Sequence, residues 1–195
     1  MPSTTGERLI GKTLSEIAPN HVARYEWASQ ELLKRIKPGA SVLDAACGCG
    51  YGSRMLAEAG FIVDSFDISH EAETWQRNFL HENVKFRRDN ILNIKGKYDA
   101  VVSIETIEHI ETASQWIGMV GEMTDIFVGT VPNEEVVSFS PERDRFHFRH
   151  YTKSEVIELL DGWGVESWAT QYAKWENYEM RPGDDGMTLG FGAVK

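Results

Sequence analysis

The chain alternates short apolar runs with longer segments of mixed polarity. The runs are rich in valine, isoleucine and phenylalanine, and their length suits strands that are buried on both faces of a sheet. The strands that this pattern predicts lie at residues 42–43, 61–66, 84–88, 98–104, 125–130, 165–170 and 187–194.

Between the runs, apolar residues recur at spacings of three and four, the period of an amphipathic helix. The first such segment ends before Pro38 and Gly39, and Thr152 followed by Glu155 is a capping-box pattern. The predicted helices lie at residues 19–36, 53–59, 70–81, 112–123 and 152–160. Strands and helices that alternate in this way predict an open sheet with helices on both faces.

Composition narrows the class of protein. The 195 residues fit one domain, and 42% hydrophobic and 26% charged residues are typical of globular proteins. No apolar run approaches the roughly 20 residues of a membrane-spanning helix. The opening residues have no long apolar core, so we expect a cytoplasmic protein that does not bind a membrane. The net charge of −10 argues against a broad basic surface for nucleic acid.

Residues 41–52, SVLDAACGCGYG, join the first predicted strand to a helix through three glycines at alternate positions. Glycines at the end of a strand let the backbone adopt positive φ and lie directly against a ligand. Asp67 ends the second strand about 20 residues on, where a carboxylate suits the ribose of a nucleoside cofactor. The glycines follow Asp44 in G-x-G-x-G order rather than in the G-x-G-x-x-G order of dinucleotide folds.

This loop resembles the first motif of the class I S-adenosylmethionine-dependent methyltransferases, an acidic residue followed by small residues and G-x-G-x-G. The resemblance extends from about residue 22 to the C-terminus. It implies a single Rossmann-like α/β domain whose mostly parallel, seven-stranded sheet ends in an antiparallel hairpin, and it implies S-adenosylmethionine as cofactor. The residues that it assigns to cofactor binding are Tyr25, Asp44, Ala46, Gly48, Gly50, Asp67, Ile68, Asp89, Asn90 and Glu105.

The resemblance implies different roles within that set. Asp44 and Glu105 end central strands, where the family holds the methionine part of the cofactor. Asp89 and Asn90 offer a carboxylate or an amide to the adenine amino group, although such a pair also suits a plain turn. Tyr25 ends an H-x-x-R-Y pattern that resembles the opening of many small-substrate methyltransferases, so Tyr25 belongs either to a lid over the cofactor or to the core.

Residues 104–110, IETIEHI, form a second motif after the fourth predicted strand. Glu105, Glu108 and His109 are spaced i, i+3 and i+4, which on a helical turn places them on one side. We expect His109 and Glu108 to be catalytic, with the imidazole as general base. The alternative is a helix N-terminus, where acidic residues favour the macrodipole and the histidine only packs.

A metal site is a sharper hypothesis for the same stretch. With His147 and His150 from FHFRHYT, the carboxylates and imidazoles form a donor set that suits Mg²⁺ or Mn²⁺. The predicted ligands are Glu105, Glu108, His109 and His147. The order E-x-x-E-H, P-N-E, H-x-x-H resembles the small-RNA 3′-end 2′-O-methyltransferases, and E-x-x-E-H also resembles ubiquinone-pathway O-methyltransferases. The alternatives for residues 147–150 are a solvated polar loop and a contact of Arg149 with an anionic group of the substrate.

The leading hypothesis is an enzyme that methylates an oxygen or a nitrogen of a small molecule or sugar. Metal-assisted 2′-O-methylation of RNA is the alternative within enzymes, although the acidic net charge does not favour RNA. A catalytically inactive partner subunit that keeps the fold and the cofactor is the third hypothesis. The identity of the acceptor and the oligomeric state do not follow from the sequence.

We expect one domain over residues 1–195, built from four parts. These are N-terminal lid helices at 1–38, a cofactor-binding core at 39–131, a variable link at 132–151, and a C-terminal helix and hairpin at 152–195. The tryptophans after the core either line a pocket or pack in the core, the commoner fate of aromatic residues. They are Trp116, Trp163, Trp168 and Trp175.

Overall fold

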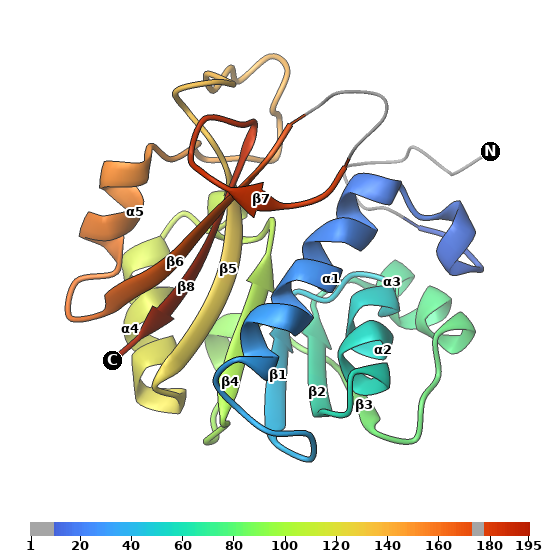
Figure 1. Cartoon of the computed structure of the whole chain (residues 1–195). Coiled ribbons are helices and arrows are strands. Elements are labelled where there is room, and N and C mark those ends of the chain that lie inside the picture. Colours follow the sequence, from blue (N-terminus) through green and yellow to red (C-terminus); the bar gives the residue numbers. More distant parts are fainter. Residues whose placement is uncertain (1–9, 173–177) are drawn as a thin grey trace.

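The computed structural model describes residues 10–172 and 178–195, and within them the chain forms one eight-stranded sheet with helices on both faces (Figure 1). The strand order is β3-β2-β1-β4-β5-β8-β6-β7. Strands β1 to β5 run parallel, whereas β8 pairs antiparallel with both β5 and β6. The strands are β1 (Ser41–Ala45), β2 (Ile62–Asp67), β3 (Val84–Arg88), β4 (Ala100–Ile104), β5 (Ile126–Pro132), β6 (Gly164–Gln171), β7 (Arg181–Pro182) and β8 (Thr188–Val194). The predicted α/β class and the antiparallel C-terminal pair are confirmed.

The eighth strand is the departure from the seven that the sequence predicts. β7 has two residues and pairs with β6 at Ala169 and Thr170. A two-residue strand that contains a proline and lies at the sheet edge has no alternating pattern, so periodicity does not reveal it.

The helices agree with the predicted positions except at their ends. α1 stops at Leu33, short of the predicted residue 36, because two following amides both bond to the Leu32 carbonyl and tighten the last turn. The helix predicted at 70–81 ends at Trp75 and continues as a 3₁₀ turn. The helices are α1 (Pro19–Leu33), α2 (Tyr51–Glu58), α3 (His70–Trp75), α4 (Ala113–Met123) and α5 (Lys153–Leu159). In the described parts of the chain, none is both long and apolar enough to cross a membrane.

Neighbouring residues of the central strands enter two separate cores, one on each face of the sheet. In β1, Val42 packs in the core that α1 and α2 cover, while Leu43 packs in the core that α4 and α5 cover. Val102 and Val101 of β4 repeat this alternation, and all four residues are fully buried. Burial on both faces is the reason that these strands read as continuous apolar runs.

Helix α1 is fixed across the sheet through Glu31. Glu31 is 3% exposed, and its carboxylate accepts hydrogen bonds from Arg35 at 2.7 Å and from Ser167 of β6 at 2.7 Å. Arg35 also donates to the Ser167 hydroxyl at 3.2 Å, which closes a triangle of contacts. The C-terminal end of α1 is therefore anchored to the first half of β6.

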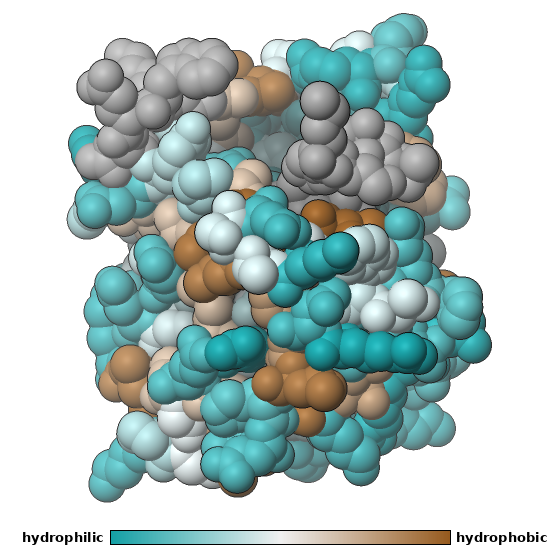
Figure 2. All heavy atoms as spheres, turned by 90° about the vertical axis from the view of Figure 1, so that its right-hand side faces the viewer, coloured by the Kyte–Doolittle hydropathy of each residue, from teal (hydrophilic) through white to brown (hydrophobic). Residues whose placement is uncertain are grey.

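β3 forms one edge of the sheet and presents charged residues there. Lys85, Arg87 and Arg88 are exposed. The surface on that side of the molecule is mostly hydrophilic, with hydrophobic residues in small, separate patches (Figure 2). Charged side chains on an open edge oppose pairing with a strand of another molecule.

The predicted capping box of α5 is present. The Thr152 hydroxyl accepts from the Glu155 amide at 3.2 Å, and the Glu155 carboxylate accepts from the Thr152 amide at 2.8 Å. Two amides that the helix itself cannot pair are thereby satisfied.

We expect Thr152→Ala to lower the free energy of unfolding by about 1 kcal/mol, because the substitution removes the hydroxyl that caps the helix. Urea unfolding followed by circular dichroism measures the change. Thr74→Ala is the matched control, since Thr74 is exposed within α3 and its hydroxyl bonds only to a carbonyl of its own helix. Equal losses in both variants would contradict the capping role.

Candidate active site

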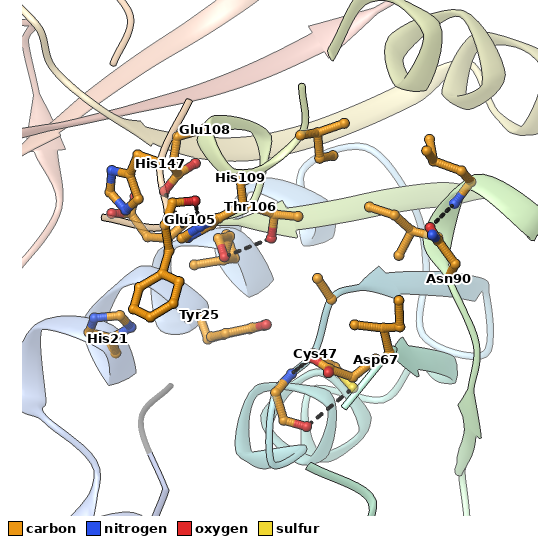
Figure 3. A pocket seen from close by; sticks show the side chains of 18 of the residues that line it. His21, Tyr25, Cys47, Asp67, Asn90, Glu105, Thr106, Glu108, His109 and His147 are labelled. Carbon is orange, nitrogen blue, oxygen red and sulfur yellow. Dashed lines mark hydrogen bonds and ion pairs between the residues drawn. The ribbon is translucent and has the colours of Figure 1, made fainter. Parts of the chain in front are cut away.

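A cavity of about 750 Å³ opens at the carboxyl ends of the parallel strands. It lies beside β1 and β4, where the strand order reverses and where open α/β sheets bind ligands. Figure 3 shows Cys47 and Asp67 at one end and Glu108 and His147 at the other. The described residues that line the cavity are His21, Tyr25, Ala46, Cys47, Gly48, Tyr51, Asp67, Ile68, Asn90, Ile91, Leu92, Ile104, Glu105, Thr106, Glu108, His109, Ile110, Phe146 and His147.

The glycine loop after β1 contains residues with left-handed backbone. Ala46 has a φ of 60° and Gly48 a φ of 57°. The Gly48 amide donates to one carboxylate oxygen of Asp67 at 3.0 Å, and the other oxygen accepts from the Ser69 amide at 2.8 Å. A Cβ built on Gly48 would meet nothing within 4 Å, so this backbone faces open space. The loop therefore presents backbone to a ligand, as the sequence predicts.

Tyr25 forms a wall of the cavity by packing on Gly52. A Cβ on Gly52 would lie 2.1 Å from the tyrosine ring, so the contact requires glycine. The Tyr25 hydroxyl donates to Asp44 at 3.0 Å, and the Ser53 hydroxyl donates to the other carboxylate oxygen at 2.6 Å. Burial raises the pKa of Asp44 to about 6, although both hydrogen bonds favour the carboxylate. Asp44 therefore does not line the cavity, but its hydrogen bond holds the Tyr25 side chain that does.

A buried cluster around Arg24 joins α1 to the ends of β4, β6 and β8. The guanidinium donates to Gln171 and to Thr188 at 3.0 Å each, and it lies 3.3 Å from the carboxylate of Glu105. Nε2 of His21 lies 3.1 Å from the same guanidinium, which can only donate. Burial lowers the pKa of His21 to about 3, so its ring is neutral. The cluster holds Glu105 at the cavity in a fixed ion pair.

The prediction that Glu105, Glu108 and His109 share one helical turn is wrong. Glu105 follows β4 with a φ of 49°, and only Ile107–His109 form a 3₁₀ turn. The left-handed residue turns the chain at the strand end, and all three side chains still line the same cavity. Glu108 is 1% exposed, and one of its oxygens lies 4.0 Å from Nε2 of His109.

The link after β5 brings His147 into this group. The Phe148 amide donates to the Glu108 carbonyl at 2.8 Å, and Nδ1 of His109 donates to the Phe146 carbonyl at 3.0 Å. These bonds hold the His147 ring edge-on to His109, with 4.5 Å between the ring centroids. Burial and the neighbouring imidazoles lower the pKa of His147 to about 4, so this ring is neutral near pH 7.

Three of the four predicted metal ligands meet. Glu108, His109 and His147 each offer one ligand atom, and these atoms lie within 4.8 Å of one another. A carboxylate oxygen with imidazole nitrogens fits a divalent ion such as Mg²⁺ or Mn²⁺. Glu105 stands outside the group, because its carboxylate pairs with Arg24 and accepts from the Thr130 hydroxyl at 2.8 Å.

Most predicted cofactor residues reach the cavity, and three do not. Those that line it are Tyr25, Ala46, Gly48, Asp67, Ile68, Asn90 and Glu105. Asp44 lies behind the wall, and Gly50 starts α2 with a φ of 85°. Asp89 is exposed and accepts from Asn93 at 2.9 Å, so the structure brings Asn90 to the cavity and leaves Asp89 outside it.

The tryptophans pack in the core. Trp116 is 0% exposed within the core under α4, and Trp163 and Trp168 pack against the same core. Trp175 lies outside the described residues. The lining residues that sequence reasoning missed are mostly apolar, and their spacing marks them only as buried. They are His21, Cys47, Tyr51, Ile91, Leu92, Ile104, Thr106, Ile110 and Phe146.

Comparison with known proteins agrees with this geometry. A family model described as a methyltransferase domain matches residues 20–176. A Mycolicibacterium smegmatis protein assigned as an S-adenosylmethionine-dependent methyltransferase is 31% identical over 173 residues, which cover 83% of this chain and 65% of that protein. The chain thus spans just under two thirds of the length of this relative.

Two solved structures share the fold. The magnesium protoporphyrin IX methyltransferase of Synechocystis, with S-adenosylhomocysteine bound, has a TM-score of 0.68 at 22% identity, and the match covers 91% of this chain and 84% of that one. A small RNA methyltransferase has a TM-score of 0.69 at 17% identity, and the match covers 98% of this chain and 27% of that one.

Three observations point to the same family. They are the family model that matches residues 20–176, the relative at 31% identity, and the glycine loop that presents its backbone to the cavity where the strand order reverses. The chain belongs to the class I S-adenosylmethionine-dependent methyltransferases, enzymes whose cofactor is S-adenosylmethionine.

Proposed function

We propose that the protein transfers the methyl group of S-adenosylmethionine to an oxygen or a nitrogen of a small molecule or sugar. The observation that carries the proposal is a cavity of about 750 Å³ that reaches without a break from Gly48 to His109. The bound cofactor supplies an electrophilic methyl group on a sulfonium whose departure needs no proton donor. The protein must therefore align the acceptor and remove its proton.

In this proposal the cofactor lies along the carboxyl ends of β1 and β2. The backbone at Ala46 and Gly48 contacts its methionine part, because the loop faces open space there. Asp67 lines the cavity at the end of β2, where its carboxylate accepts hydrogen bonds from the ribose hydroxyls. Ile68 and Asn90 flank the adenine at the ends of β2 and β3.

Other predicted cofactor residues act through their neighbours. Asp44 holds Tyr25, and Gly50 lets the chain enter α2. Asp89 accepts from the Asn90 amide at 2.7 Å and so orients the residue that does line the cavity. Glu105 lines the cavity at the end of β4 and, while paired with Arg24, accepts a hydrogen bond from the amino group of the methionine part in this proposal.

In this proposal His109 acts as the general base. Its Nδ1 lies 3.0 Å from the Phe146 carbonyl, which can only accept, so the neutral ring carries its lone pair on Nε2. The Glu108 carboxylate lies 4.0 Å from that nitrogen. It stabilises the imidazolium that forms when His109 takes the acceptor's proton.

Two segments at the rim are proposed to select the acceptor. α1 contributes His21 and Tyr25 to the cavity, and the link contributes Phe146 and His147. These segments cover the cavity without belonging to the glycine loop or to the parallel strands. The acceptor named for the Synechocystis enzyme, a magnesium porphyrin, is a small molecule, which supports acceptors of this class.

We expect Gly52→Ala to weaken S-adenosylhomocysteine binding about tenfold or more, because the new methyl group displaces the Tyr25 ring and breaks its bond to Asp44. Titration calorimetry measures the affinity. Gly118→Ala is the matched control, since Gly118 is exposed on α4 and a Cβ there meets nothing within 4 Å. Unchanged affinity in Gly52→Ala would remove the wall from the binding site, and no binding by the unmodified protein would contradict the cofactor assignment.

His109→Ala should spare S-adenosylhomocysteine binding and lower kcat by roughly 100-fold or more, because it removes the general base. The assay follows release of S-adenosylhomocysteine with a panel of hydroxylated, amino and sugar acceptors. His70→Ala serves as control, because the His70 side chain is exposed on α3 and is not among the described residues that line the cavity. Full turnover by His109→Ala would rule out the proposed base.

Metal assistance is a second candidate, and the observation that favours it is the meeting of Glu108, His109 and His147 within 4.8 Å. These residues would hold Mg²⁺ or Mn²⁺, and the ion would lower the pKa of an acceptor hydroxyl. The terminal ribose of RNA is the acceptor in this version.

For this second candidate, we expect tritium transfer from S-adenosylmethionine to RNA oligomers to stop with EDTA and to return with added Mn²⁺. The reason is that the hydroxyl pKa rises again when the ion is removed. Transfer that ignores the chelator would exclude the metal. Transfer to small acceptors without any to RNA would leave the first candidate standing.

A further inference from the structure

His150 closes a chain of hydrogen bonds that begins at His147 in the cavity. The residue is 3% exposed and lies behind the His147 ring, with 5.0 Å between the ring centroids. Nδ1 of His150 lies 2.7 Å from the carbonyl oxygen of Val137, and its Nε2 lies 2.8 Å from Nδ1 of His147. Both nitrogens of this buried ring are therefore engaged.

The carbonyl of Val137 decides where the protons lie. A carbonyl accepts and does not donate, so Nδ1 of His150 carries a proton. In the neutral ring Nε2 then has only a lone pair, and it accepts from the Nδ1–H of His147. The same reasoning leaves Nε2 of the neutral His147 ring without a proton.

We propose that His150 is a positioning residue that fixes the tautomer of His147, so that Nε2 presents a lone pair beside Glu108 and His109. This inference rests on the proposed function, in which His147 belongs to the reacting end of the cavity. Histidines that bind metals ordinarily give their other ring N–H to a fixed acceptor. Here the acceptor is a second histidine, which is itself oriented by backbone.

A second group of donor atoms, from Asp144, His147 and His150, also lies within 4.8 Å. Its contacts favour the hydrogen-bond chain over a second ion. Asp144 already accepts from the Ser140 amide at 2.9 Å and from Arg143 at 2.7 Å. Its carboxylate lies 3.7 Å from Nε2 of His150, beyond hydrogen-bond length, whereas the 2.8 Å between the two imidazoles is a hydrogen-bond distance.

Two substitutions separate the hydrogen bonds from the packing. In His150→Gln, the amide oxygen accepts from His147 and the amide nitrogen donates to Val137, so the chain is retained. His150→Met fills similar space without a comparable acceptor. A residue that only packs would tolerate both substitutions or fail in both.

The tautomer of His147 is read by long-range ¹H–¹⁵N NMR at neutral pH, which is practicable because the chain has six histidines. We expect the Nδ1–H form in the unmodified protein and in His150→Gln, and loss of that form in His150→Met. We also expect His150→Met to weaken Mn²⁺ binding about tenfold or more and His150→Gln by no more than about threefold, as measured by electron paramagnetic resonance. Calorimetry with S-adenosylhomocysteine should show unchanged affinity in both variants.

The outcomes are distinguishable. A proton on Nε2 of His147 in the unmodified protein would overturn the inference, as would equal behaviour of the two variants. If the unmodified protein binds no Mn²⁺, metal assistance fails, and the NMR result by itself decides the role of His150. Loss of S-adenosylhomocysteine binding in His150→Met would show that the ring only supports the fold, which also overturns the inference.

Discussion

The buried carboxylate of Asp44 is the contact on which the cavity wall depends. It lies on β1, is 0% exposed, and accepts hydrogen bonds from Tyr25 of α1 and Ser53 of α2. Burying a charge costs several kcal/mol unless it is paired, and the pKa raised to about 6 shows that the two donors offset only part of that cost. Because the donors come from two helices, one charge holds both helices to the strand that leads into the glycine loop.

A residue with left-handed backbone follows each of β1 and β4, the two strands between which the strand order reverses. Ala46 follows β1 with a φ of 60°, and Glu105 follows β4 with a φ of 49°. Non-glycine residues in this region are strained and persist where the surroundings hold them. Here the Cys47 amide bonds to Phe66 at 2.9 Å and the Glu105 amide to Thr130 at 3.2 Å. Both turns carry the chain away from the sheet, and the space between them is the cavity.

The end of the cavity that Glu105, Glu108 and His147 line is suited to a cationic ligand. The Arg24 guanidinium lies 3.3 Å from the Glu105 carboxylate at this end, and this ion pair neutralises the charge of the guanidinium. His21 and His147 are neutral, because burial lowers the pKa values of both rings. The Glu108 carboxylate also lines this end, so the lining suits a sulfonium and an amino group better than an anionic ligand.

The sequence by itself determined the order of strands and helices, the glycine loop and the nature of the cofactor. The elements and the loop are local features, since they depend on apolar spacing, on glycine's access to positive φ and on residues at strand ends. The cofactor follows from the resemblance of this loop to the methyltransferase motif. Both Asp89 and Asn90 are predicted to bind the cofactor, but only Asn90 lines the cavity. Sequence reasoning reaches its limit here, because the turn that orients the two side chains lies beyond the regular alternation of β3.

Only the tertiary structure decided that Tyr25 rests on Gly52, that Arg24 takes Glu105 out of the metal group, and that His147 meets His109. Each of these contacts joins residues far apart in the chain. No local pattern encodes them, because the packing of α1 and of the link over the finished sheet brings the partners together. The methyl donor is therefore readable from the sequence, whereas the groups that face the acceptor are set by packing.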